Sequence, residues 1–317
     1  MGEMNLRGMK KIVTLFAALA LLWSAGAGVA CAQFSAEGSF ARTLKVTGAV
    51  DLDVKTGSGS INVRTGAAGT VQVQAKIKAR EGWGGGLSGE EKVRRLEANP
   101  PIRQTGNTIV IGEIEDRELN NNVSISYELM VPADTRLRSH TGSGSQTVDG
   151  VRGPVETGTG YGSITLSNIG GEVRASTGSG SIQVRGLSGS INGSTGSGDI
   201  EVQQSAPGDL ELQTGSGSIE VSGVKGGVRA RTGSGEISAE GQMTGDWRLH
   251  TSSGSVTVRL PQGAAFDLAA RTSSGSIRSD HPITVQGTIG RRELNGKVRG
   301  GGPLLEVSTS SGSIHIE

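Results

Sequence analysis

The chain has 317 residues, of which 53 are glycine, 34% are hydrophobic and only 3% are aromatic, so any core must be built from aliphatic side chains. Its 31 basic and 30 acidic side chains nearly cancel, which argues against nucleic-acid binding, because that function concentrates positive charge. The single cysteine, Cys31, excludes an intrachain disulfide and a cysteine metal cluster.

The N-terminus has the pattern of an export signal. Two lysines, Lys10 and Lys11, precede an apolar run over 12–23, and small residues follow. This pattern predicts a signal peptide over 1–32. The run is too short to cross a bilayer, and no later segment is apolar for long enough, so we expect a chain that does not span the membrane.

Two ways of processing this signal remain open. Ala30-Cys31-Ala32 fits an A-x-A cleavage site, which predicts a mature chain that begins at Gln33. The string "GVAC" alternatively resembles a lipoprotein box with a lipidated Cys31, although Gly28 stands where such a box needs a bulky aliphatic residue. Both routes predict an extracytoplasmic protein, located in the periplasm, on the cell surface or in the medium.

Residues 33–136 form a predicted β-rich capping part. Alternating apolar residues predict strands over 70–79 and 123–132. Between them, Ser88 and Glu91 have capping-box spacing, and Val93 with Leu96 supplies an apolar stripe, which together predict a short helix. We expect this part to cap one end of a repetitive domain over 137–317 and to be continuous with it.

The rest of the chain repeats T-G-S-G or a close variant. The copies begin at Thr56, Thr141, Thr159, Thr177, Thr195, Thr214, Thr232, Thr251, Thr272 and Thr309. From Thr141 to Thr272 the starts are 18 to 21 residues apart, and the last step, of 37 residues, is about two periods. A constant period of this length indicates a repeat architecture.

Within each copy an apolar residue lies four positions before the threonine, and two more lie five and seven positions after it, as in Ile182 and Val184. The parity of the inward positions therefore flips across the glycines, which predicts two short strands joined by a corner. One copy alone buries too little apolar surface to be stable, so the copies must stack. In one copy, Gln146 replaces the usual aliphatic residue, which indicates a core defect or a capping rung.

The predicted fold is all-β: a parallel β-solenoid (β-helix) with rungs of about 18 residues, spaced about 4.8 Å apart. The irregular N-terminal part forms a β-rich cap that carries a short helix. The alternative is an antiparallel meander in which T-G-S-G forms a hairpin turn.

Four strings in this layout resemble a known bacterial family. They are "LDVKTGSGSINV", "ISYELMVPADTRLRSHTGSGS", "GVRGPVETGTGYGSITL" and, at the C-terminus, "GGGPLLEVSTSSGSIHIE". Together they resemble the β-strand-repeat, adhesin-like family catalogued as domain of unknown function 4097, over nearly all of the chain after the signal. The resemblance implies an exported repetitive β-protein of the cell envelope. It brings no catalytic residues, and some relatives are associated with envelope stress.

No cofactor or metal site is expected. His140 and His250 share a repeat position about six rungs apart, which separates them by about 29 Å. His281 and His315 supply no metal-ligand spacing either. Calcium-binding β-rolls carry aspartates in their turns, whereas the turns here carry serine or threonine. None of the G-S-G strings continues into the Gly-Lys-Ser/Thr of a phosphate loop.

Two groups of charged residues are candidate binding sites. Asp199, Glu201, Glu220 and Glu236 point outward on adjacent rungs of one face, with Glu201 and Glu220 stacked as like charges. Arg291, Arg292, Lys297 and Arg299 form a basic loop near the C-terminus. The opposite face carries Arg229, Arg231, Arg248 and Arg271, so one face is expected to be acidic and the other basic. Both groups are also consistent with ordinary solvated surface.

The aromatic residues offer one further candidate. Trp83 lies outside the period among glycines, so it could be an exposed sugar platform or a hydrophobic plug under the cap, and Trp247 is expected in the core. We predict a non-enzymatic, exported cell-envelope protein that acts through surface contacts, as an adhesin-like protein, a scaffold or an envelope-stress component. Its expected partner is envelope polymer, a lipid surface or another envelope protein. The alternatives are a β-helix enzyme that acts on polysaccharide through the acidic group and, more remotely, an ice-binding solenoid.

Overall fold

The structure is a computed structural model that describes residues 35–80, 86–285, 290 and 292–317. These residues belong to one compact unit, Ser35–Glu317. The predicted signal peptide, with Cys31, lies outside the described residues.

The described chain is all-β apart from two helices, and its strands follow the repeat. The strand before each corner glycine pair, called here the first strand of a rung, is β2 (Val50–Ser58), β8 (Thr135–Ser143), β10 (Val155–Tyr161), β12 (Val173–Ser179), β14 (Ile191–Ser197), β16 (Leu210–Ser216), β20 (Phe266–Ser274) or β24 (Leu304–Ser311). The second strand is β3 (Ile61–Thr65), β9 (Gln146–Asp149), β11 (Ile164–Ser167), β13 (Ile182–Leu187), β15 (Ile200–Gln204), β19 (Val256–Arg259), β21 (Ile277–Ser279) or β25 (Ile314–Ile316).

Two longer strands, β17 (Ile219–Ser234) and β18 (Ile237–Ser253), each run from the second strand of one rung into the first strand of the next. The remaining elements flank the rungs: β1 (Ser35–Lys45), β4 (Thr70–Arg80), α1 (Gly89–Ala98), β5 (Ile102–Thr105), β6 (Thr108–Ile111), α2 (Arg117–Asn120), β7 (Val123–Val131), β22 (Ile283–Thr284) and β23 (Glu293–Val298).

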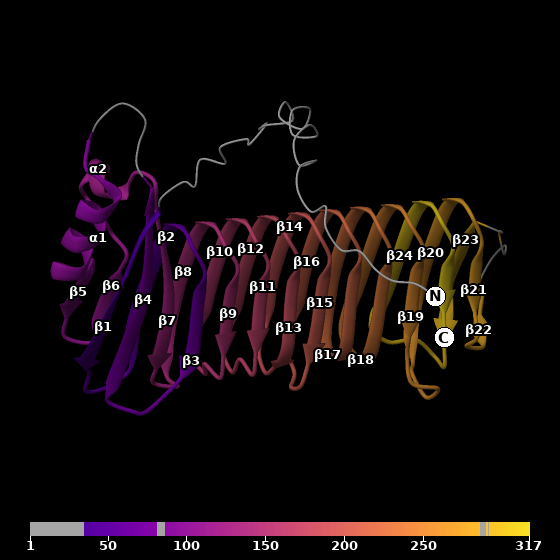
Figure 1. Cartoon of the computed structure of the whole chain (residues 1–317). Coiled ribbons are helices and arrows are strands. Elements are labelled where there is room, and N and C mark those ends of the chain that lie inside the picture. The colour runs from indigo at the N-terminus through magenta and orange to yellow at the C-terminus, as the bar shows by residue number, and fades with distance from the viewer. Residues whose placement is uncertain (1–34, 81–85, 286–289, 291) are drawn as a thin grey trace, which may run out of the picture. The chain divides into compact units, whose positions relative to one another are not determined.

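Neighbouring rungs pair in parallel and in register. Thr159, for example, lies between Thr141 and Thr177, each opposite it on a neighbouring strand. Among the described strands, antiparallel pairing is confined to β1–β4, β4–β7, β5–β6, β20–β23 and β22–β23, at the ends of the stack. The antiparallel meander is therefore wrong, and the parallel alternative holds for the rungs (Figure 1).

The order of the rungs differs from their order in the sequence at both ends. The first copy pairs directly with the copy at Thr141, so Thr56 lies opposite Thr141 although 84 residues lie between them, most of them from the start of β4 to the end of β7. The last copy lies between two earlier rungs, with Thr309 opposite both Thr251 and Thr272. The 37-residue step is thus not two periods of a continuing stack, because it holds β22 and β23 and a return of the chain.

The inward positions match the predicted parity. The apolar residues before and after the corner are buried, except for the half-buried Ile277, and the repeat threonines are 0 to 8% exposed. Several rungs also bury an aliphatic residue at or just beyond the end of the second run, such as Val151, Ile169, Leu187 or Val224, and Gln204 takes this position opposite Leu187. The sequence argument missed this third inward position, because it lies outside the two alternating runs.

The buried threonine hydroxyls hold adjacent rungs together. Thr177 Oγ1 donates to the carbonyl of Gly162 at 2.9 Å, and Thr195 Oγ1 donates to that of Gly180 at 2.9 Å. The same bond recurs at Thr141, Thr159, Thr214, Thr232, Thr251, Thr272 and Thr309. A buried hydroxyl must be hydrogen-bonded, so the threonine has a structural role. The inward direction also argues against a threonine ice-binding face.

The second corner glycine has a backbone that only glycine adopts readily. Gly180 has φ +143°, and a Cβ there would lie 2.1 Å from the carbonyl oxygen of Gly162. The corner therefore needs glycine both for its conformation and for the close approach of the next rung.

Gln146 is neither a defect nor part of a capping rung. It is fully buried in an interior rung, flanked by β3 and β11. Its Oε1 accepts hydrogen bonds from Ser139 Oγ at 2.5 Å and Thr157 Oγ1 at 2.7 Å, and its Nε2 donates to the carbonyl of Gly158. Its own rung, through Ser139, and the next rung, through Thr157 and Gly158, supply polar partners for this buried amide.

The cap and the core contain the predicted helix and tryptophan. Helix α1 begins after Ser88, whose hydroxyl accepts from the Glu91 amide at 3.1 Å, and it buries Val93 and Leu96. Trp247 is fully buried, and its ring nitrogen donates to the carbonyl of Gly226 at 2.9 Å. Both predictions are confirmed.

Candidate functional site

The outward side chains of the first strands define a surface that we call the first face. Its central column contains, in stack order, Asp53, Arg138, Glu156, Arg174, Asn192, Glu211, Arg229, Arg248, Glu306 and Ala269. Opposite charges alternate along most of this column, which stabilises neighbouring strands. The expected basic face is therefore wrong: this face carries both signs of charge.

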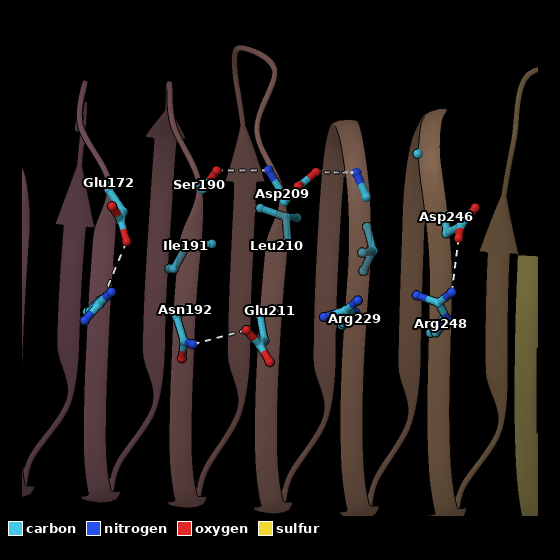
Figure 2. A pocket seen from close by; sticks show the side chains of 14 residues that line it. Glu172, Ser190, Ile191, Asn192, Asp209, Leu210, Glu211, Arg229, Asp246 and Arg248 are labelled. Carbon is cyan, nitrogen blue, oxygen red and sulfur yellow. Dashed lines mark hydrogen bonds and ion pairs between the residues drawn. The ribbon is translucent and has the colours of Figure 1, made fainter. Parts of the chain in front are cut away.

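A groove of about 510 Å³ crosses the first face between β12 and β18. Glu172, Glu211, Arg229 and Arg248 line it (Figure 2), together with Gly227 and Gly245. A second groove of about 590 Å³ shares Glu211, Arg229 and Arg248 with the first and is also lined by Leu212, Gln213 and Arg231.

Some of the groove's carboxylates serve the fold. Asp209 Oδ1 accepts from the backbone N–H of Gly227 at 2.8 Å, and Asp246 Oδ1 accepts from that of Leu304 at 3.0 Å. Ser190 Oγ accepts from the Asp209 amide at 3.1 Å (Figure 2). These side chains bond one rung to the next at the start of the first strands, so they are poor candidates for a ligand contact.

The arginines of the groove differ in their surroundings. Arg248 pairs with Asp246 at 3.1 Å and with Glu306 at 3.5 Å. Arg229 lies directly opposite Arg248 on the next strand. Within the described part of the chain, no carboxylate lies within 4.0 Å of the guanidinium of Arg229 or Arg231. Two exposed arginines thus line the groove beside a third, an arrangement that attracts an anionic group.

The structure places the predicted acidic group on adjacent rungs of the other face, which we call the second face. Glu201 and Glu220 are register partners, as the repeat predicted. The Gln183 amide donates to Glu201 at 2.6 Å, and Arg185 lies 3.8 Å from Glu201. These two contacts offset the like-charge repulsion.

Asp199, the third member of the acidic group, bonds to the backbone. Its Oδ1 accepts from the N–H of Ser218 at 2.8 Å, and Ser218 Oγ accepts from the N–H of Glu236 at 3.3 Å. Serines at the same position of other rungs make the same kind of bond. Asp199 therefore replaces one of these serines in a structural contact.

The predicted basic loop is spread out. Arg291 lies outside the described residues. Lys297, in β23, lies 3.9 Å from Asp267, and Arg299 Nε donates to the carbonyl of Gln262 at 3.0 Å. Arg292 is exposed, and its carbonyl accepts from the N–H of Thr272 at 2.9 Å. The fold uses this segment to cover the edge of β20.

The histidines make separate contacts, and His315 lies 3.7 Å from Asp280. His250 Nδ1 is 2.8 Å from Ser308 Oγ, and the ring of His281 packs edge-on against Phe266 with centroids 5.7 Å apart. In the part of the chain that the structure describes, no three of the side chains His, Cys, Asp and Glu come together as metal ligands do. In that same part, no helix has the length and apolar character needed to cross a membrane.

The exposed aromatic residue that the structure describes differs from the one that the sequence suggested. Trp83 lies outside the described residues. Tyr161 is 69% exposed at the corner of its rung, where the register partners on both sides are Ser143 and Ser179. The sequence analysis counts Thr159 only as the start of a repeat copy and so misses Tyr161, although a tyrosine at a serine position was an available signal.

The fold and its surfaces define an all-β repeat protein with a thin aliphatic core and charged, open outer faces. A family model described as Toastrack DUF4097 matches residues 107–317, so the chain belongs to this family. No curated protein matches the sequence.

Three solved structures are among those similar to the chain. A presumed cell adhesion protein from Clostridium sporogenes is 12% identical, with 89% of this chain and 99% of that chain covered and a TM-score of 0.22. A presumed adhesin from Bacteroides fragilis is 12% identical, with 88% and 97% covered and a TM-score of 0.33. A presumed lipid-binding protein from Parabacteroides distasonis is 13% identical, with 88% and 96% covered and a TM-score of 0.39.

Proposed function

We propose that this chain is a non-enzymatic, exported envelope protein, a parallel β-solenoid that binds an anionic envelope polymer through its first face. Residues 1–32 direct export, residues 33–136 cap the stack, and residues 137–317 present the repeated contact surface. The observation that carries the proposal is the pair Arg229 and Arg231, which line an open groove and have no described carboxylate within ion-pair distance.

An extended groove suits a polymer better than a small molecule. Neighbouring rungs repeat about every 4.8 Å, so an extended anionic chain laid across β17 and β18 meets Arg229 and Arg248 on adjacent strands, with Arg231 beside them. Open, exposed charges bind weakly one at a time and are screened by salt. Affinity would then come from many simultaneous contacts.

The enzyme alternative finds less support. A carboxylate pair that cleaves glycosides needs both groups free to act on the substrate. Asp199 instead accepts a backbone hydrogen bond, and Glu201 is engaged by Gln183 and Arg185. We therefore assign the acidic group to rung packing and surface charge.

The test is capture of isolated anionic cell-wall polymer by purified residues 33–317. We expect Arg229→Glu with Arg231→Glu to reduce capture by at least tenfold and wild-type capture to fall as salt rises, because the contact is electrostatic. Arg64→Glu with Arg278→Glu is the matched control, since it makes the same change in charge at exposed sites of the second face.

Equal loss in both double variants would show that net charge, and not the groove, governs capture. Binding to anionic lipid vesicles with no binding to polymer would replace the polymer by a lipid surface and overturn the proposal. Loss only in Glu201→Lys with Glu220→Lys, or only in Arg292→Glu with Lys297→Glu, would move the site to the acidic group or the basic segment.

A further inference from the structure

The C-terminal rung, β24 and β25, lies between two rungs that earlier parts of the chain form, β18–β19 on one side and β20–β21 on the other. Trp247 of β18 and Leu268 of β20 both lie opposite Leu305, on its two sides. Ile314 likewise lies between Val256 and Ile277. Figure 1 shows β24, in yellow, between the orange strands β18 and β20. The space between these two rungs, called here the slot, is thus one rung wide.

The segment forms backbone hydrogen bonds with the strands on both of its sides, and its inward side chains are buried in the core. Backbone bonds join Gly254 N to Ser311 O and Gly312 N to Ser274 O, each at 2.9 Å, and Glu317 N to Val258 O at 2.8 Å. The five inward side chains of the segment are 0 to 4% exposed: Leu305, Val307, Thr309, Ile314 and Ile316. The backbone bonds follow the same pattern as those between the other rungs.

The segment is joined to the preceding chain by a glycine hinge. All strand pairings of β24 and β25 in the described chain are with β18, β19, β20 and β21, and the last of these ends at Ser279. The hinge over 299–303 reads Arg-Gly-Gly-Gly-Pro, and Gly300 and Gly301 have φ of +92° and +89°. The segment therefore docks as a unit onto a surface made by other parts of the chain.

A second copy of the chain carries the same segment and the same slot. We propose that Leu304–Glu317 is an exchangeable strand, and that the slot between β18–β19 and β20–β21 is a strand-acceptor site that also takes this segment from another copy. Exchange in both directions closes a symmetric dimer, because each copy gives a segment and receives one. The length of the hinge decides whether the slot holds the segment of its own chain or that of another copy. A hinge too short to reach the slot of its own chain leaves the segment able to bind only to another copy.

The experiment uses residues 33–317, which lack Cys31, with one engineered cysteine pair. His250→Cys with Ser308→Cys places two thiols on outward, register-paired positions of β18 and β24. In the chain with its natural hinge, oxidation should give a disulfide within one chain. With residues 300–302 deleted, we expect light scattering to show a dimer. After oxidation, most chains should run as disulfide-linked dimers on a non-reducing gel.

A second pair and a second hinge provide the controls. Arg231→Cys with His250→Cys joins β17 to β18, which no exchange separates, so this disulfide should stay within one chain with either hinge. A hinge lengthened by three residues should remain monomeric. A hinge-deleted chain that is monomeric with an intrachain disulfide between positions 250 and 308 would overturn the proposal, as would a dimer in which this disulfide does not join two chains.

If the hinge-deleted chain does not fold, refolding supplies the decision. The natural-hinge chain that carries His250→Cys with Ser308→Cys is refolded at low and at high protein concentration before oxidation. The fraction of interchain disulfide should rise with concentration, because capture of another copy's segment is bimolecular. A fraction that stays at zero at every concentration would refute exchange.

Discussion

At the scale of single residues, the repeat is a set of contacts between rungs. Thr177 donates to Gly162, and the next rung repeats the bond from Thr195 to Gly180. A Cβ at Gly180 would collide with the carbonyl oxygen of Gly162, which is the oxygen that accepts from Thr177. Glycine at the corner therefore leaves this acceptor accessible. Conformation, close approach and hydrogen bonding thus favour the same four-residue string in every copy.

Replacement of a corner glycine should therefore be costly. We expect Gly180→Ala to lower the free energy of unfolding by about 1–3 kcal/mol from the backbone conformation alone, and further through the contact with Gly162. Ser179→Ala, at the exposed neighbouring position, should change it by about 0.5 kcal/mol or less. Urea unfolding of both variants makes the comparison, and equal midpoints would contradict it.

Gln146 allows a test of the buried polar network. Gln146→Ile restores the residue type of the other rungs but leaves the hydroxyls of Ser139 and Thr157 unpaired, which costs about 1–3 kcal/mol for each buried group. Adding Ser139→Ala and Thr157→Ala removes those groups. We expect the triple variant to be more stable than the single one, measured by urea unfolding. A triple variant that is less stable than the single one would mean that the three residues do not act together.

At the scale of elements, the cap differs from the rungs because it ends the sheet. Strand β7 pairs in parallel with β3 and antiparallel with β4, so it changes the pairing direction at the N-terminal end. Helix α1 lies against this end, where Ser39 N donates to Glu97 Oε1 at 2.8 Å and so occupies an edge amide of β1. Such a contact blocks edge-to-edge pairing with other chains.

Tyr127 in β7 makes the stability of the cap depend on pH. Burial raises the pKa of the Tyr127 phenol above its ordinary value. The stabilising effect of the neutral phenol is therefore complete below about pH 10 and is lost as pH rises further, because the unfolded state ionises first. Tyr127→Phe should remove this part of the loss, by up to about 1.4 kcal/mol per pH unit.

The measurement compares urea midpoints of the wild type and Tyr127→Phe at pH 9 and pH 11. Tyr161, which is exposed, supplies the control, since Tyr161→Phe should leave the pH dependence as in the wild type. An equal loss of stability in the wild type and in Tyr127→Phe would show that the buried phenol does not govern the alkaline transition.

At the scale of the whole molecule, the stack has an order of rungs that differs from their order in the sequence, and it has two charged faces. The first copy and the last copy both occupy positions that their place in the sequence does not indicate. The first face mixes charges of both signs, while the acidic group lies on the second face. Contacts to a partner therefore depend on which face is presented.

Export makes a prediction about the N-terminus. Mass spectrometry of protein recovered from outside the cytoplasm should show a chain that begins at Gln33 and carries no lipid, because Ala30-Cys31-Ala32 fits the cleavage pattern. Cys31→Ser should leave its location unchanged. A lipid-modified N-terminal Cys31, with loss of membrane retention in Cys31→Ser, would establish the lipoprotein route instead.

The repeat period and the parity of apolar residues were enough to predict the two strands of a rung, the glycine corner, the inward threonine and the buried Trp247, because these features depend on local backbone geometry and on one inside direction. Ser88 and Glu91 likewise predicted the start of α1, because their hydrogen bond joins residues only three positions apart in the sequence.

Only the tertiary structure decided which rungs are neighbours and which charges meet. Rungs of nearly identical sequence can pair equally well in many orders, so the insertion of Thr309 between Thr251 and Thr272 depends on the long connections and the end strands. The same insertion sets Glu306 beside Arg248. Contacts between residues far apart in sequence carry no local signal, and the charged grooves are made of such contacts.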